Sequence, residues 1–97
     1  MSTEDAASHL ARFAVESDIA DVVVRDAHVS LDERQDGEPV TRVVLLLEDP
    51  SGDTWNVERV SELRREIGRR ATDLGLPAVS VTLVPVSEAD LVEAFRR

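Results

Sequence analysis

Two histidines and a set of neighbouring acids are the residues of this 97-residue chain that could support acid–base or metal chemistry. His28 stands between Asp26 and Ser30 in a segment of alternating apolar and polar residues, and His9 lies near the N-terminus. Imidazole titrates near neutral pH and binds metals, so His28 could act as a ligand, a pH-sensitive contact or a base. Neither histidine has a metal-ligand spacing or a nucleophile motif around it. We interpret His28 as a partly buried, hydrogen-bonded residue of a sheet.

The acids and glycines have the spacing of turns. The pairs Asp32-Glu33 and Glu48-Asp49 follow apolar segments, and the stretch 49–53 lacks the alternating ligands of a calcium loop. The four glycines are scattered, so no phosphate-binding loop is present. The chain has no cysteine, which excludes disulfides, thiolate metal sites and cysteine nucleophiles. We predict no catalytic residue, no metal site and no cofactor, and we expect a cytoplasmic protein that is not an enzyme.

The charge of the chain disfavours two classes of partner. Twenty acids stand against eleven arginines with no lysine, and the net charge is −9. Such a field repels phosphate backbones and anionic membrane surfaces. No apolar run approaches the roughly 20 residues that cross a bilayer. We therefore predict no nucleic-acid or membrane partner, and we expect a protein partner or self-association, with a homodimer as the simplest case.

The first half of the chain predicts one helix and a β-hairpin. Ser2 is a capping residue before apolar positions at helical spacing, which predicts a helix over 3–16. Alternating residues predict a strand over 20–33, and the Asp36-Gly37 pair predicts a turn. The segment 40–48 is apolar at both alternating positions, which is typical of a central strand covered on both faces.

The second half predicts a helix, a strand and a short terminal helix. Asn56 is a good N-cap, and Trp55 before it with Val60 after it has the spacing of a hydrophobic staple, so a helix is expected over 57–74. Gly75 supplies a left-handed C-terminal cap. Alternation predicts a strand over 78–86. A capping-box pattern beginning at Ser87 predicts a short helix over 88–95.

This order predicts an α+β fold for a single domain over 1–97. The elements follow α-β-β-α-β with a final short helix, as an open-faced two-layer sandwich whose three-stranded mixed sheet has helices on one face. Over roughly residues 4–86 the order resembles type II KH domains and the cytoplasmic domains of cation diffusion facilitators. The first resemblance implies a Gly-x-x-Gly clamp for nucleic acid, but Gly68 is isolated here. The second implies metal-binding histidines, of which only His28 has a comparable place. The resemblance therefore contributes the fold alone.

The helices should cover the sheet face that holds Val29, Leu31, Val79 and Leu83, and nothing except the terminal helix remains for the other face. We call that other side the second face. An uncovered apolar sheet face typically marks an interaction surface. We expect a protein-interaction or oligomerisation module that acts through the second face or through an exposed strand edge. A metal-sensing domain, an acidic inhibitor of a basic partner and a small enzyme using His28 are the alternatives. The predicted interface residues are Val22, Val24, His28, Val44, Leu46, Trp55, Val84, Leu91 and Phe95.

Overall fold

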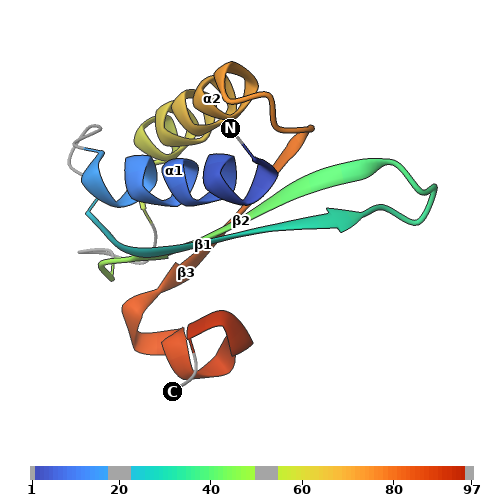
Figure 1. Ribbon diagram of the computed structural model, residues 1–97. Coiled ribbons are helices and arrows are strands. Elements are labelled where there is room, and N and C mark those ends of the chain that lie inside the picture. Colours follow the sequence, from blue (N-terminus) through green and yellow to red (C-terminus); the bar gives the residue numbers. More distant parts are fainter. Residues whose placement is uncertain (1, 18–22, 50–54, 96–97) are drawn as a thin grey trace.

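The computed structural model describes residues 2–17, 23–49 and 55–95, and it confirms the α-β-β-α-β order (Figure 1). Two helices lie together on one side of a three-stranded sheet, and two 3-10 turns lie beyond the end of the last strand. The elements are α1 (Thr3–Glu16), β1 (Val24–Glu33), β2 (Pro39–Leu47), α2 (Val57–Asp73), β3 (Val79–Pro85), η1 (Val86–Leu91) and η2 (Glu93–Phe95).

Strand β2 is the central strand, as its apolar composition predicts. It pairs antiparallel with β1 and parallel with β3, so that Val43 lies between Val29 on one side and Val81 on the other. Thr41 fixes the start of β3, because its N–H donates to Ala78 O at 2.7 Å and its hydroxyl donates to Pro77 O at 3.0 Å. These two bonds satisfy the N–H and the hydroxyl of a fully buried residue and hold the two parallel strands in register.

The helix ends have the caps that the sequence predicts. Ser2 Oγ accepts a hydrogen bond from Asp5 N (3.1 Å) at the start of α1, and Asn56 Oδ1 accepts from Glu58 N (3.0 Å) and Arg59 N at the start of α2. These side chains satisfy amide groups that have no partner inside the helix. Gly75 follows α2 with φ of 76°, a conformation that residues with a Cβ rarely adopt.

The core lies between the helices and the sheet. Leu10 of α1, Leu45 and Leu47 of β2, and Leu63 and Ile67 of α2 have no exposed surface. The helix-facing residues of the edge strands, including Val29, Val79, Val81 and Leu83, pack against this cluster and are half-buried. The far end of the β1–β2 hairpin extends beyond the helices, and for this reason Leu31, although on the helix-facing side, is 43% exposed (Figure 1).

Val24 is not on the second face, which corrects the prediction from strict alternation. The pairing shifts between Val24 and Asp26, so that Val24 lies opposite Leu47 and Asp26 lies opposite Leu46. Arg25 is the extra residue of this β-bulge, and one inserted residue reverses the side to which the preceding side chain points. Val24 consequently joins the buried cluster beneath the helices.

The C-terminal segment also differs from the prediction. It forms two 3-10 turns in place of one short helix, and η1 begins at Val86 with no side-chain cap, so the predicted capping box at Ser87 is wrong. Instead the Ser87 N–H donates to Asp49 Oδ1 at 3.0 Å. A carboxylate from the segment after β2 therefore takes the amide that a local cap would have taken.

Replacing Leu45 with alanine should lower the free energy of unfolding by about 2–5 kcal/mol, because this leucine of the central strand is fully buried in the core cluster. Urea unfolding followed by circular dichroism measures the change. Leu91→Ala is the control, since Leu91 is 75% exposed and its replacement should stay within about 0.5 kcal/mol of the original. Equal losses in the two variants would contradict this assignment of the core.

Candidate protein-interaction site

The second face is less apolar than the sequence predicts. All side chains that β1 contributes to it are polar, and Arg42 of β2 adds a guanidinium. Val44 and Leu46 are half-buried, and Val84 is 7% exposed. Figure 1 shows η1 and η2 on the side of the sheet away from α1 and α2, and η1 contacts both β2 and β3. The expectation of a broad uncovered apolar face is therefore wrong.

The predicted interface residues do not form one surface. Val24 is in the core, Val22 lies outside the described residues, and Trp55 is half-buried beside α2. His28 is exposed, and no hydrogen bond joins it to another described residue, which corrects the interpretation of a partly buried, bonded histidine. The rest belong to the second face or the C-terminal turns: Val44, Leu46 and Val84 are on the face, Leu91 is exposed, and Phe95 is half-buried.

The short segment Glu48-Asp49 after β2 links three parts of the molecule. The indole Nε1–H of Trp55 donates to Glu48 O at 2.9 Å, and the Glu48 carboxylate forms an ion pair with Arg25 of β1. Asp49 accepts the Ser87 amide of η1. The indole ring is thereby held at the start of α2, where it packs against the core from one side.

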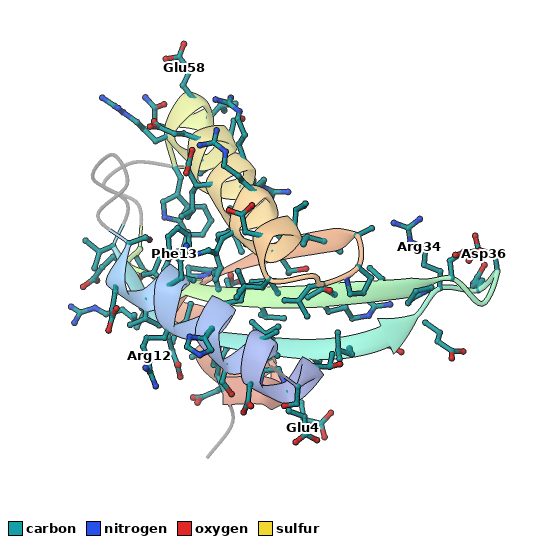
Figure 2. All side chains as sticks on the ribbon, turned by 45° about the horizontal axis from the view of Figure 1, so that its top comes forward. Glu4, Arg12, Phe13, Arg34, Asp36 and Glu58 are labelled. Atoms are coloured by element: carbon teal, nitrogen blue, oxygen red, sulfur yellow. The ribbon has the colours of Figure 1, made fainter. Side chains whose placement is uncertain are left out.

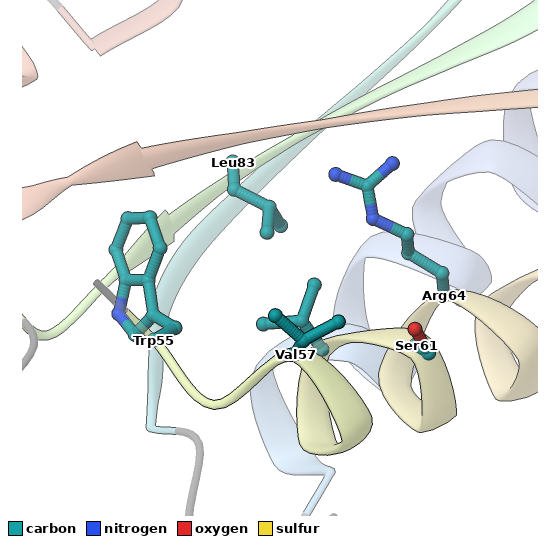
Figure 3. Close-up of a pocket in the computed structure, with 6 residues that line it drawn as sticks. Trp55, Val57, Ser61, Arg64 and Leu83 are labelled. Carbon is teal, nitrogen blue, oxygen red and sulfur yellow. The ribbon is translucent and has the colours of Figure 1, made fainter.

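A groove opens between this indole and β3. It has a volume of about 380 Å³ and is lined by Trp55, Val57, Val60, Ser61, Arg64 and Leu83. Figure 3 shows Leu83 of β3 and Val57 of α2 between the indole on one side and the Arg64 guanidinium on the other. Val57 is 74% exposed, and Arg64 forms no ion pair with any described residue. The groove therefore combines exposed apolar surface with one uncompensated cation.

Beside this groove, β3 offers backbone groups that no strand of the described chain uses. Because Ala78 O accepts from Thr41 N, the even-numbered residues of β3 face β2. Parallel strands alternate the direction of these groups. The N–H and C=O groups of Val79, Val81 and Leu83 therefore point away from the sheet, and no hydrogen bond to them is found in the described part of the chain. Such groups can pair with a further strand.

The other edge of the sheet is protected in part. Strand β1 carries a bulge and four charged residues, and the side chains of two of them cover outward-facing amides. Asp26 Oδ1 accepts from Ala27 N and Asp32 Oδ1 accepts from Glu33 N, both at 2.8 Å. Bulges and charges on an edge strand are common defences against unwanted strand pairing. Strand β3 has no charged residue and no bulge in its pairing with β2, so the two edges differ in kind.

A second groove, of about 350 Å³, lies between α1 and β1 and brings together Glu4, Ser8 and His28. These are the residue types of a serine-hydrolase triad. No hydrogen bond connects any two of them, and all three side chains are exposed. The geometry therefore provides no activated nucleophile, since a triad requires the base to lie within hydrogen-bond reach of the serine.

A cation–π contact joins the two helices. Arg70 of α2 lies over the ring of Phe13 of α1, 4.8 Å from its centroid. Phe13 is labelled in Figure 2.

Within residues 2–17, 23–49 and 55–95, no three histidine, cysteine or acidic side chains cluster as a metal site would require. In the same ranges, no helix has the length and apolar character needed to cross a membrane.

No family model, no curated protein and no solved structure matches this chain. The assignment of a site consequently depends on the physical chemistry of the fold. Sequence reasoning included Trp55 and named an exposed strand edge as one possible surface, but it did not identify β3 as that edge. The signal was available: Val79–Pro85 is an apolar and hydroxyl-bearing segment without a single charge in a chain of net charge −9.

The pKa of Asp32 lies below its usual value of 3.8, chiefly because the carboxylate accepts the Glu33 backbone N–H and also because Arg42 Nε lies 2.8 Å from it. A depressed pKa in the folded state contributes stability above the unfolded pKa, and this contribution is lost as pH falls through the folded pKa.

Arg42→Gln should raise the Asp32 pKa while leaving it below 3.8. NMR titration of the Asp32 carboxyl carbon measures this pKa in both proteins. An unchanged Asp32 pKa in Arg42→Gln would show that Arg42 does not lower it.

Asp49→Ala should loosen η1 without unfolding the sheet, because it removes the acceptor of the Ser87 amide. Loss of about 1 kcal/mol of local stability raises amide exchange at Ser87 by roughly threefold to tenfold. Asp49→Asn is the matched control, since its side-chain oxygen can still accept and should preserve most of the protection. Exchange is read residue by residue by NMR. Unchanged protection in Asp49→Ala would show that this bond does not hold the turns.

Proposed function

We propose that this chain is a non-catalytic protein-interaction module that binds an extended protein segment along the free edge of β3. The single observation that carries the proposal is the difference between the two sheet edges. On β1 the outward amides of Ala27 and Glu33 are covered by carboxylates, whereas on β3 the outward amides of Val79, Val81 and Leu83 are uncovered in the described chain. An added strand would gain backbone hydrogen bonds there.

The groove beside β3 supports the same proposal. A strand placed along β3 would direct alternate side chains to the helix-facing side of the sheet. On that side Leu83, Val57 and the Trp55 ring provide apolar contact, and Arg64 provides a cation at the rim. Backbone pairing gives affinity and such side-chain contacts give selectivity. The expected ligand is therefore an extended segment with apolar residues at alternate positions.

The alternative functions receive less support. A metal-sensing role requires a group of ligands, and the described residues contain no such cluster. An acidic inhibitor would present its carboxylates to a basic partner, but the groove at β3 presents Arg64 among apolar side chains. The proposal of strand binding uses both the backbone and the side chains of one site.

The test compares two proline substitutions. Val81→Pro removes an outward amide of β3, and Val29→Pro removes the corresponding amide of β1; both valines are half-buried, face the helices and lie opposite Val43. Proline is tolerated at such edge positions because no ladder bond is lost. Peptides selected from a random phage-displayed library on the unmodified protein serve as the probe, and their affinities for the three proteins are measured by isothermal titration calorimetry.

We expect the selected peptides to bind Val81→Pro at least about tenfold more weakly, which corresponds to roughly 1.4 kcal/mol, and to bind Val29→Pro nearly unchanged. Circular dichroism establishes that both variants are folded. Peptides that bind Val81→Pro as tightly as the original protein, or that lose affinity equally for both variants, would overturn the assignment of the β3 edge.

A further inference from the structure

We infer that the natural occupant of the β3 edge is a second copy of this chain, paired antiparallel about a two-fold axis at Val81. This inference rests on the proposed strand-binding function and names its partner. The two three-stranded sheets would then continue into one another through β3. A two-fold interface uses the same patch on both molecules, so the patch must be complementary to itself.

The side chains of β3 are complementary to themselves in this arrangement. With the axis at Val81, Val79 lies opposite the partner's Leu83, and the two Val81 residues face each other. All of these are apolar, half-buried residues on the helix-facing side. On the opposite side Ser80 lies opposite the partner's Thr82. Apolar pairs and hydroxyl pairs are both favourable across neighbouring strands.

The backbone favours the same axis. In an antiparallel ladder, residues whose polar groups point toward the neighbouring strand exchange two hydrogen bonds. The outward residues Val79, Val81 and Leu83 would pair only with one another, so every bonded pair is complete. Moving the axis one residue to Thr82 would place Pro85 opposite Val79, and proline has no N–H to donate. The axis at Val81 keeps proline outside the ladder.

Charge also favours this edge as the meeting point of two identical molecules. Each chain carries a net charge of −9, so approach through an acidic surface would be repulsive. Strand β3 has no charge, whereas β1 carries three acids and one arginine. The cation beside the groove, Arg64, has no ion-pair partner among the described residues and would be available to acids of the second molecule.

The direction of helix α2 is also compatible with this pairing. A two-fold axis at β3 would place the two α2 helices antiparallel, with the first half of one near the second half of the other. The dipoles of antiparallel helices are mutually favourable. Residues 57–64 carry two acids and two arginines, and residues 65–73 carry two acids and three arginines, so both halves of the helix hold charges of both signs.

Sedimentation velocity over a range of protein concentrations tests the inference. We expect a monomer–dimer equilibrium in which Val81→Pro raises the dissociation constant about tenfold or more. The substitution lies at the axis and is present in both copies, so each molecule loses one amide that would bond to the other. Val29→Pro should change the constant by less than about twofold. A strict monomer up to about 0.1 mM, or equal weakening by both substitutions, would overturn the inference.

Disulfide trapping provides a readout that does not depend on the stability of the proline variants. The chain has no cysteine, so Val81→Cys introduces a single thiol, and the two copies at the axis would lie about 5.5 Å apart between Cα atoms, within reach of a disulfide. Under mild oxidation Val81→Cys should form a covalent dimer much faster than Val29→Cys. Faster trapping of Thr82→Cys than of Val81→Cys, or equal rates for Val81→Cys and Val29→Cys, would overturn the proposed axis.

The failures of the two proposals are distinguishable. If the protein remains monomeric and selected peptides still bind in a manner abolished by Val81→Pro, the β3 edge binds strands and the partner is a different protein. If the protein is monomeric and selected peptides ignore Val81→Pro, the strand-binding function itself is wrong. A dimer that Val81→Cys traps rapidly supports both.

Discussion

Strand β2 is the element on which the rest of the structure depends. Its backbone is hydrogen-bonded on both sides, to β1 through even-numbered residues and to β3 through odd-numbered ones. Leu45 and Leu47 beneath the helices are fully buried, and Val44 and Leu46 on the other side are half-buried. Because β2 occupies the centre, both remaining strands become edges. A three-stranded sheet must therefore protect two edges or use one of them.

The sequence protects only one of these edges. Carboxylates on β1 accept two of its outward amides, those of Ala27 and Glu33, and the bulge at Arg25 distorts the regular edge. Strand β3 contains hydroxyl and aliphatic side chains with one terminal proline. The asymmetry matters because an unprotected edge has an aggregation cost unless something pairs with it. A self-limiting two-fold pairing would avoid that cost, since it leaves only the protected β1 edges free.

The fold could be predicted from the sequence because its signals are local. The caps at Ser2 and Asn56 and the glycine at position 75 act within one helical turn, and the apolar character of β2 directly reflects its burial. The misplaced features depend on contacts distant in the chain. Val24 points to the helix-facing side because of a bulge in the pairing of β1 with β2. The start of η1 is bonded through the Ser87 N–H to Asp49, which lies 38 residues earlier in the chain. The candidate site was predictable only in part: the lack of charge in Val79–Pro85 can be read from the sequence, but the position of this segment at a sheet edge follows only from the strand order.

The position of the indole at the groove has a practical consequence. Trp55 is the only tryptophan of the chain and there is no tyrosine, so the intrinsic near-ultraviolet emission excited at long wavelength comes from this one ring. Its Nε1–H is fixed to a backbone carbonyl, while part of the ring borders the open groove. The molecule thus has one intrinsic fluorophore at the proposed binding groove, and a change in its emission would report occupancy of that groove without an attached dye.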